Sequence, residues 1–330
     1  MEAVLRLLVS SLIYIISAGI TLWTAGALFY DVGRAAKMAW LLAFLWVAAV
    51  IAIFVTWSPL WKPFLLLLAL FSLFLAWWFS QKPSNDRQWQ AATARLARIT
   101  IDGDAVVVED MRVNEYRTLN DFTPLYETRV YHLSRLCGVD AVITNWGSRW
   151  MTHPMFVFDF GSDGRVCFSI EVRYRCGQRY NLLRSLYRQQ ELIYVVCDER
   201  DAILRRTKYS QGQTVYLYRI VGEMSEIRRF LLEYVKQVNA VFENPVWYHG
   251  LSANCTTSIY TQGRGRIVWD WRLLFNGKLD RMLYDRKRLD QRLPFATLRQ
   301  QSRVNEYANR APREGFGDFI RRELSGYDPS

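Results

Sequence analysis

The chain has 330 residues, of which 51% are hydrophobic and 15% aromatic, and its formal net charge is +11. Its apolar residues are concentrated in long uncharged runs within residues 1–80, whereas the rest of the chain is mixed and charged. This distribution excludes a uniformly water-soluble protein and predicts a membrane region followed by a folded domain. Because no nucleic-acid-binding motif accompanies the positive charge, we expect no DNA or RNA partner.

Three uncharged segments approach or exceed the length that crosses a bilayer: Leu7–Tyr30, Ala39–Trp57 and Phe64–Phe79. The first is too long for the apolar core of a secretory signal, which spans about 7–15 residues. The third would extend roughly 24 Å as a helix, so a re-entrant segment is the alternative to a full span. We predict a three-helix transmembrane region over residues 1–80 and a polar linker over residues 81–91.

The charges of the short loops do not fix the orientation of these helices. With a cytoplasmic N-terminus, three spans place the large domain outside the cytoplasm. Arg34 and Lys37 then lie in an external loop, while Arg6 and Lys62 lie inside. The positive-inside rule mildly favours the reverse, but it is a statistical rule. Charge alone therefore leaves both orientations open.

Residues 92–330 are expected to form one domain of mixed α and β structure with a basic C-terminal extension. Short apolar runs predict four strands: Ile99–Ile101, Ala105–Val108, Glu191–Cys197 and Val215–Ile220. The first two flank the turn residues Asp102-Gly103-Asp104 and so form a hairpin. A helix is predicted from Ser225 to just before Pro245, because apolar residues recur there at helical spacing.

A second hairpin is predicted around Gly164, and its strands are Met155–Phe160 and Arg165–Arg173. Apolar residues alternate along both strands and should share one face: Phe156, Phe158, Phe160, Val166, Phe168, Ile170 and Val172. A turn with Gly164 in the left-handed conformation pairs Met155 with Glu171. His153 and Glu171 then lie on the other face as diagonal neighbours, roughly 7–8 Å apart at the backbone. The pattern thus predicts a histidine base beside an orienting carboxylate.

Cys255 lies where a helix is predicted to begin. Asn254 and Thr256 beside it are residue types that satisfy the free N–H groups of a first helical turn. The positive end of a helix favours the thiolate, which is the nucleophilic form of cysteine. Cys255 is therefore the candidate nucleophile, although inert buried cysteines are common. A base and a third polar group complete such a site.

Three histidines compete for the role of base. His153 is favoured by the carboxylate predicted beside it, whereas His132 falls in a stretch that is typical of a helix. His249 lies shortly before Cys255. His249 and Arg173 are further candidates for a supporting role at the site.

Several short motifs follow one another in a specific order: Asp121-Phe122-Thr123, His153-Pro154, Ser169-Ile170-Glu171-Val172-Arg173, Glu191-Leu192-Ile193-Tyr194, Asp198-Glu199-Arg200-Asp201 and Asn254-Cys255-Thr256-Thr257. Together they resemble the Lnb N-terminal periplasmic domain family over about Ala92 to Leu324. The order of a histidine before an Asn-Cys helix start is also similar to that of permuted papain-like thiol enzymes, such as lecithin retinol acyltransferase. The resemblance implies an α+β fold, in which transmembrane helices precede a permuted papain-like domain with an antiparallel sheet packed on helices.

The resemblance also implies roles for individual residues: Cys255 as nucleophile, His153 as base and Glu171 as third member. Apart from the resemblance, Asn254 and Thr256 are the candidates for supporting the oxyanion. His249 falls where the family often has asparagine, which argues against His249 as the base. The family name comes from lipoprotein N-acyltransferases. It implies an acyl chain moving from a phospholipid to the N-terminal amine of a lipoprotein through a thioester.

This function would place the protein in the bacterial inner membrane with its catalytic domain in the periplasm. The expected partners are the membrane, a phospholipid donor and a lipoprotein or peptide acceptor. An envelope thiol peptidase or amidase is the alternative, and a non-catalytic scaffold that binds lipid or a partner is a second. We expect no metal and no cofactor, because the three histidines and five cysteines show no paired spacing and no nucleotide signature appears.

Overall fold

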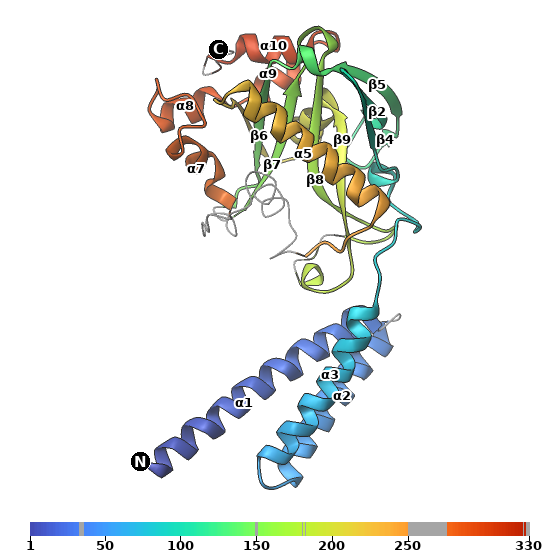
Figure 1. Cartoon of the computed structure of the whole chain (residues 1–330), viewed down its shortest axis with the longest axis vertical. Helices are drawn as coiled ribbons and strands as arrows, with labels where there is room; N and C mark the ends of the chain where they lie inside the picture. Colours follow the sequence, from blue (N-terminus) through green and yellow to red (C-terminus); the bar gives the residue numbers. More distant parts are fainter. Residues whose placement is uncertain are drawn as a thin grey trace. The chain divides into compact units, whose positions relative to one another are not determined.

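The computed structural model describes residues 1–32, 36–148, 151–179, 181, 183–249, 276–325 and 327, and the chain divides into two compact units. The helical unit consists of Met1–Ser84, Arg179–Gln190 and Trp247–Gly250. The sheet unit consists of Asn85–Gln178, Glu191–Val246 and Leu251–Ser330. Figure 1 shows the helices α1 to α3 of the first unit and the sheet of the second. The helical unit thus includes two short segments that come from well beyond the N-terminal helices.

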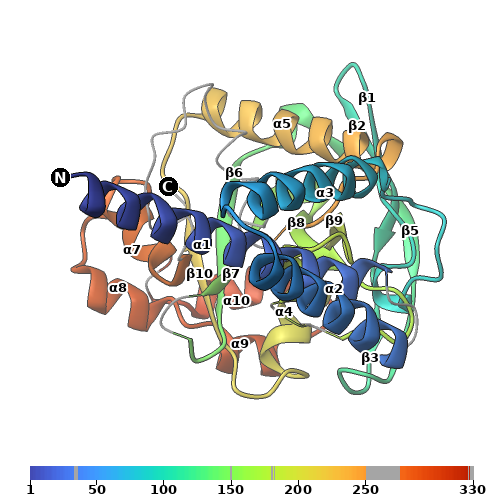
Figure 2. The same ribbon diagram turned by 90° about the horizontal axis from the view of Figure 1, so that it is seen from below.

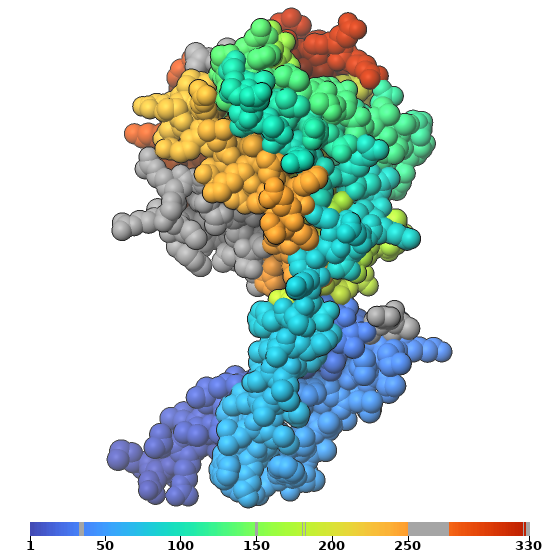
Figure 3. All heavy atoms as spheres, turned by 45° about the vertical axis from the view of Figure 1, so that its right-hand side comes forward, coloured from blue at the N-terminus to red at the C-terminus, as the bar shows by residue number. Residues whose placement is uncertain are grey.

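Three apolar helices make up most of the helical unit: α1 (Glu2–Ala27), continued by a π-helical turn at Leu28–Val32, α2 (Ala36–Thr56) and α3 (Trp61–Ser80). All three are long and apolar enough to cross a membrane. α3 begins before Pro63, which the first turn of a helix tolerates, and its 20 residues span about 30 Å. The prediction of three helices is confirmed, and the third is longer than its uncharged run suggested. Figure 3 shows the atoms of α2 and α3 in contact.

Segment Arg179–Gln190 packs on the ends of these helices within the helical unit. Arg188 donates a 2.7 Å hydrogen bond to the carbonyl oxygen of Trp78, and its guanidinium lies 4.1 Å from the centre of the Trp78 ring. Gln189 and the Trp78 indole N–H each donate a 2.7 Å hydrogen bond to the carboxylate of Asp31. The segment is therefore held to the π-helical turn after α1 and to α3 by directed polar contacts.

In the part of the chain that the structure describes, eight strands form one sheet in the order β1-β2-β9-β8-β7-β6-β10, with β5 paired to β2. They are β1 (Arg98–Asp102), β2 (Ala105–Arg112), β5 (Tyr126–His132), β6 (Gly138–Asn145), β7 (Thr152–Asp159), β8 (Arg165–Arg173), β9 (Glu191–Asp198) and β10 (Thr214–Arg219). Neighbouring strands are antiparallel, except that β2 and β9 meet in parallel. Two short strands, β3 (Glu115–Tyr116) and β4 (Phe122–Thr123), pair separately.

Helices cover both faces of the sheet, as Figure 2 shows. α5 (Met224–Glu243) lies on one face, and α4 (Glu199–Thr207), α9 (Asn305–Arg310) and α10 (Phe316–Glu323) lie on the other. α7 (Leu279–Asp285) and α8 (Phe295–Gln301) pack against residues of β6 and β10. Three apolar helices followed by a mixed sheet packed with helices confirm the predicted α+β class.

The helix predicted after Ser225 is α5, and its buried residues follow the expected spacing: Ile227, Leu231, Tyr234, Val235, Val238 and Val241. The four strands predicted from short apolar runs are β1, β2, β9 and β10. His132, which was expected in a helix, instead ends β5. Its neighbours Val130 and Tyr131 are residue types that favour strands, which is the physical reason for this difference.

The register of the β7–β8 hairpin differs from the prediction by two residues. Met155 pairs with Ser169, not with Glu171. Gly161–Asp163 form a 3₁₀ turn, and Gly161 and Gly164 both have positive φ, at 57° and 91°. The connection is therefore longer than the tight turn that was assumed. Because the shift is even, every side chain keeps the face assigned from the sequence.

Both faces of this hairpin are buried. On one face Phe156, Phe158 and Phe168 lie with their ring centres 5.2–6.1 Å from that of Tyr234 on α5. On the other face Met155, Val157 and Cys167 belong to a core shared with α4, α9 and α10. The predicted aromatic face is confirmed by these ring contacts. The face that carries His153 and Glu171 is the one covered by α4.

Candidate functional site

His153 lies near the start of β7, and its side chain is 9% exposed. It shares a face of the sheet with Ser169 and Glu171 of the neighbouring strand β8. The His153 Nε2 atom lies 2.8 Å from the Ser169 hydroxyl oxygen. That hydroxyl donates a 2.8 Å hydrogen bond to Oε1 of Glu171.

The histidine and the glutamate do not bond directly. His153 Nε2 and Glu171 Oε1 are 3.8 Å apart, which is beyond hydrogen-bonding distance. The prediction that both residues project from one face is confirmed. The serine hydroxyl nevertheless stands between them, so the contact between Glu171 and the imidazole runs through Ser169.

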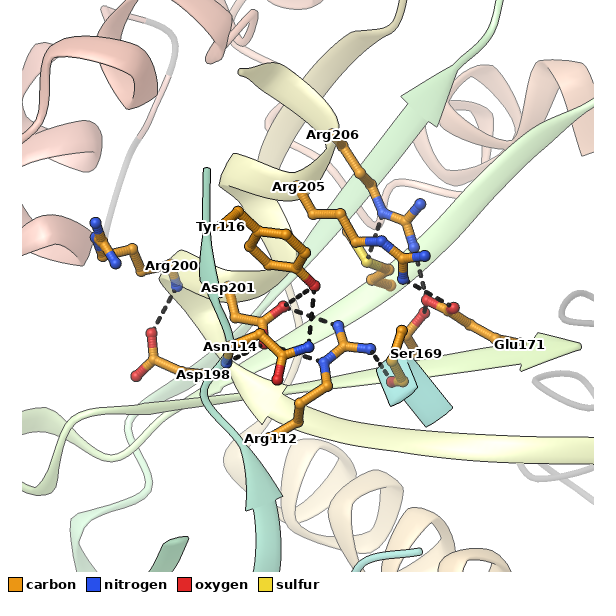
Figure 4. A network of polar contacts seen from close by, with 12 residues as sticks. Arg112, Asn114, Tyr116, Ser169, Glu171, Asp198, Arg200, Asp201, Arg205 and Arg206 are labelled. Atoms are coloured by element: carbon orange, nitrogen blue, oxygen red, sulfur yellow. Dashed lines mark hydrogen bonds and ion pairs between the residues drawn. The ribbon is translucent and has the colours of Figure 1, made fainter. Parts of the chain in front are cut away.

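Two arginines from the last turn of α4 reach Glu171, as Figure 4 shows. Arg206 Nη2 lies 2.7 Å from Oε1 of Glu171, and Arg205 Nη1 lies 3.4 Å from Oε2. Arg206 also donates from Nε to the sulfur of Met155 at 3.3 Å. The carboxylate of Glu171 is thus paired with two cations. Little water reaches it, since its side chain is 14% exposed.

The sequence of α4 explains why its two arginines stand at that end. Asp198 caps the helix by accepting a 2.8 Å hydrogen bond from the backbone N–H of Arg200. Acidic residues occupy the first turn and basic residues the last turn, which complements the helix dipole. The residues Asp198-Glu199-Arg200-Asp201, noted as a motif, therefore form the start of the helix that clamps Glu171.

A second buried network fixes the start of α4 (Figure 4). Arg112 of β2 donates two hydrogen bonds to Asp201, from Nε at 3.0 Å and from Nη2 at 2.8 Å. The backbone N–H of Asn114 and the hydroxyl of Tyr116 also donate to Asp201, at 2.8 Å and 3.2 Å. Because both ends of the short helix are held by ion pairs, Arg205 and Arg206 have a fixed position above the sheet.

The charges around the site set the protonation of its members. Burial alone would raise the pKa of the Glu171 carboxyl, but the charges of Arg206 and Arg205 outweigh it and hold that pKa well below its usual range. Burial lowers the pKa of the His153 imidazole to about 3, and the two arginines act in the same direction against the opposing charge of Glu171. At neutral pH the site therefore holds a neutral imidazole and an ionised carboxylate.

Other sequence-predicted residues have different surroundings. Arg173 is buried on β8, but its guanidinium donates to the carbonyl oxygens of Thr93 and Ala94 and to the side chain of Asn85. It ties the segment before β1 to the sheet and makes none of its hydrogen bonds with His153 or Glu171. His249 belongs to the helical unit, where burial lowers the pKa of its imidazole.

The remaining predicted site residues, Asn254, Cys255 and Thr256, lie outside the described residues. His132 is bonded at the opposite end of the hairpin from His153, with Nδ1 2.8 Å from a carboxylate oxygen of Asp163 in the turn. Among the described residues, no group of three or more His, Cys, Asp or Glu side chains could hold a metal ion.

Sequence reasoning missed Ser169, Arg205 and Arg206. Ser169 precedes Glu171 by two positions, so the strand period places it on the same face, and this was a usable signal. For the arginines the signal was weaker. A glutamate on a buried face requires a cationic partner, but the sequence does not state which arginine supplies it.

Taken together, the fold and the site define a protein with three apolar N-terminal helices and an α+β unit that buries a histidine, serine and glutamate array. Residues 122–277 match the model of the Lnb N-terminal periplasmic domain family, and this range contains His153, Glu171 and Cys255. The match supports the resemblance to that family. No curated protein and no solved structure matches the chain. The family and the three helices fit a membrane protein with a periplasmic domain.

Proposed function

We propose that this protein is a membrane-anchored cysteine acyltransferase that moves an acyl chain from a phospholipid to the N-terminal amine of a lipoprotein. The observation that carries the proposal is the buried array of His153, Ser169 and Glu171, because it supplies an oriented neutral base. The nucleophile is Cys255, which lies in the same family match. Such a base and thiol are the parts of a papain-like thiol enzyme.

In the first step the imidazole of His153 takes the proton of the Cys255 thiol, and the sulfur attacks the carbonyl carbon of a phospholipid ester. The oxyanion accepts hydrogen bonds from the backbone N–H of Cys255 and the side chain of Asn254. When the tetrahedral intermediate collapses, its C–O bond breaks. The departing alkoxide takes the proton from the imidazolium, which gives a lysophospholipid and an acyl-thioester.

In the second step the amine of the acceptor attacks the thioester carbonyl and loses a proton to His153. The C–S bond then breaks, the thiolate recovers a proton from the imidazolium, and an amide is released. Transfer instead of hydrolysis requires that water be kept from the thioester. Three membrane-length helices in the same chain suit a lipid donor, because its acyl chain then need not cross water to reach the sulfur.

The principal alternative is a thiol peptidase or amidase of the cell envelope, which would use the same residues with water as the acceptor. A protein that only binds lipid or a partner is the second alternative. The membrane-length helices favour a lipid substrate over a soluble peptide. The burial of an ionised glutamate under two arginines favours catalysis over scaffolding, since perturbed carboxylates of this kind cluster at functional sites.

Intact-mass measurement of the purified full chain after incubation with phospholipid vesicles tests the proposal. We expect a gain of one acyl chain that a diacylated lipopeptide removes as its amine becomes acylated. Cys255→Ala should show no gain. Cys137→Ala is the matched control, because Cys137 is an exposed free cysteine and would reveal non-specific acylation.

Two results would contradict the transferase. Peptide cleavage that depends on Cys255 without any acyl adduct would identify a thiol hydrolase. Full biological activity of Cys255→Ala would identify a non-catalytic role. A Cys255→Ser variant that traps a stable ester would add support, because an oxygen ester is discharged more slowly than a thioester.

A further inference from the structure

We infer that Ser169 is a positioning residue whose hydroxyl selects the Nε2–H tautomer of His153 and so leaves Nδ1 as the basic ring nitrogen. This inference deepens the proposed function, since it assigns the atom that receives the thiol proton. It rests on three consecutive contacts among side chains that are at most 14% exposed: His153 to Ser169, Ser169 to Glu171, and Glu171 to Arg206.

The direction of these hydrogen bonds follows from the chemistry of the partners. Glu171 is an ionised carboxylate between Arg206 and Arg205, so it only accepts hydrogen bonds. The Ser169 hydroxyl has a single proton, and its 2.8 Å contact with Oε1 requires that this proton point to Glu171. The serine oxygen can then only accept from the imidazole, which lies 2.8 Å away.

The reverse arrangement places two acceptors in contact. If Ser169 donated to an unprotonated Nε2, its oxygen and the carboxylate oxygen of Glu171 would face each other at 2.8 Å without a proton between them. In the buried site that repulsion is not screened by water. Nε2 therefore carries the proton, and Nδ1 keeps the lone pair. Arg205 and Arg206 enforce this tautomer, because their charges keep Glu171 ionised and therefore unable to donate a hydrogen bond.

The position of Ser169 also explains why a glutamate 3.8 Å from the imidazole can act on it. A direct carboxylate contact would favour the imidazolium. The neutral Ser169 hydroxyl between the two groups instead orients the imidazole and separates it from the carboxylate charge. His153 is thus prepared as a neutral base with a defined tautomer. A wrong tautomer would present an N–H instead of a lone pair to the thiol.

Nitrogen-15 NMR of histidine-labelled full chain in lipid vesicles tests the inference directly, since the chain has three histidines. His153→Gln identifies the His153 signals. At neutral pH we expect the wild type to show a protonated Nε2 and an unprotonated Nδ1. Ser169→Thr, which keeps a hydroxyl, should retain this pattern, whereas Ser169→Ala should give a mixture of tautomers.

An Nδ1–H tautomer in the wild type, or an unchanged Nε2–H tautomer in Ser169→Ala, would overturn the inference. The wild-type spectrum tests the inferred tautomer of His153 even if a variant fails to fold. Ser302→Ala is the matched control, because Ser302 is buried and its hydroxyl has no hydrogen-bond partner among the described residues. It should leave the His153 signals unchanged.

Acylation of the same samples separates this inference from the proposed function. We expect Ser169→Ala to acylate roughly 10²-fold more slowly than wild type, and Ser169→Thr to recover most of the rate. If the tautomer is as inferred but phospholipid never acylates the protein, the proposed function fails and the inference stands. If acylation occurs with the opposite tautomer, the inference fails alone.

Discussion

The guanidinium of Arg206 lies 2.7 Å from the carboxylate of Glu171 inside the sheet unit, with both side chains less than 15% exposed. A buried pair of this kind adds little stability over apolar residues, because both charges lose their water. Its position beside a histidine is better explained by the electric field that it creates. The pair fixes the carboxylate in its ionised form, and through Ser169 it fixes the state of His153.

Removal of Glu171 should be strongly destabilising. Glu171→Ala leaves Arg206 buried without its carboxylate partner, and the expected loss is about 3–5 kcal/mol in the free energy of unfolding. Chemical denaturation of the full chain in detergent measures it. Asp121→Ala is the control, since Asp121 pairs with Arg117 on the surface and both side chains are more than half exposed. A loss no larger than that of Asp121→Ala would show that Glu171 is not a buried partner of Arg206.

The stability of the protein should fall on acidification, beginning near neutrality. The pKa of His153 is about 3 in the folded chain, below its value of about 6.5 in an unfolded chain. Between these values the unfolded state binds the extra proton, so the contribution is lost progressively as pH falls from about 6.5 towards 3. Glu171, whose pKa is also lowered, adds to the loss only below its unfolded value of about 4.3.

Unfolding free energies of wild type and His153→Gln, compared from pH 7 to pH 5, isolate the histidine. The difference between them should change with pH, because the variant lacks the titrating group. A difference that stays constant across this range would mean that His153 is as easily protonated in the folded chain as in the unfolded one.

The two-residue period of the β7 and β8 strands was enough to predict that His153 and Glu171 share a face, because successive side chains of a strand alternate between the two faces of the sheet. The register was not predictable in the same way, since it depends on the 3₁₀ turn at Gly161–Asp163 and not on the strand residues. The direct contact of the two side chains was assumed from backbone distance alone. Ser169 occupies the space between them, and its role depends on side-chain angles that cannot be read from the sequence.

The contact of Arg205 and Arg206 with Glu171 is harder to predict from a sequence. Arg205 and Arg206 come from the short helix that follows β9 in the chain, and their contact with Glu171 depends on how α4 packs over the sheet. The capping residue Asp198 and the start of the helix are local features and were recognisable as a motif. The pairing itself is a tertiary contact. For the same reason the sequence did not show that Arg173 binds backbone carbonyls instead of Glu171.

The sheet unit is expected to lie outside the cytoplasm, because the family that matches residues 122–277 is a periplasmic domain. A reporter that works only in the cytoplasm, fused after Ser330, should be silent, and a reporter that works only in the periplasm should be active. The opposite result would agree with the charges of the short loops and would remove lipoproteins as substrates.

The helical unit offers a test of whether segment Arg179–Gln190 is held on the helices. Gly26 of α1 faces Tyr187 so closely that an added Cβ would lie 1.9 Å from the Tyr187 hydroxyl oxygen. Tyr187 also stacks on Tyr30, with ring centres 5.1 Å apart, so its ring cannot move without losing that contact. Gly26→Ala should therefore lower the thermal stability of the full chain in nanodiscs.

Gly19 of the same helix provides the matched control, because an added Cβ there meets nothing within 4 Å. Alanine favours a helix over glycine by about 1 kcal/mol, so Gly19→Ala should be neutral or stabilising. In the double variant with Tyr187→Ala, the penalty of Gly26→Ala should disappear, since the atoms that clash are gone. Equal melting temperatures for Gly19→Ala and Gly26→Ala would show that Tyr187 does not rest on α1 in the membrane-bound protein.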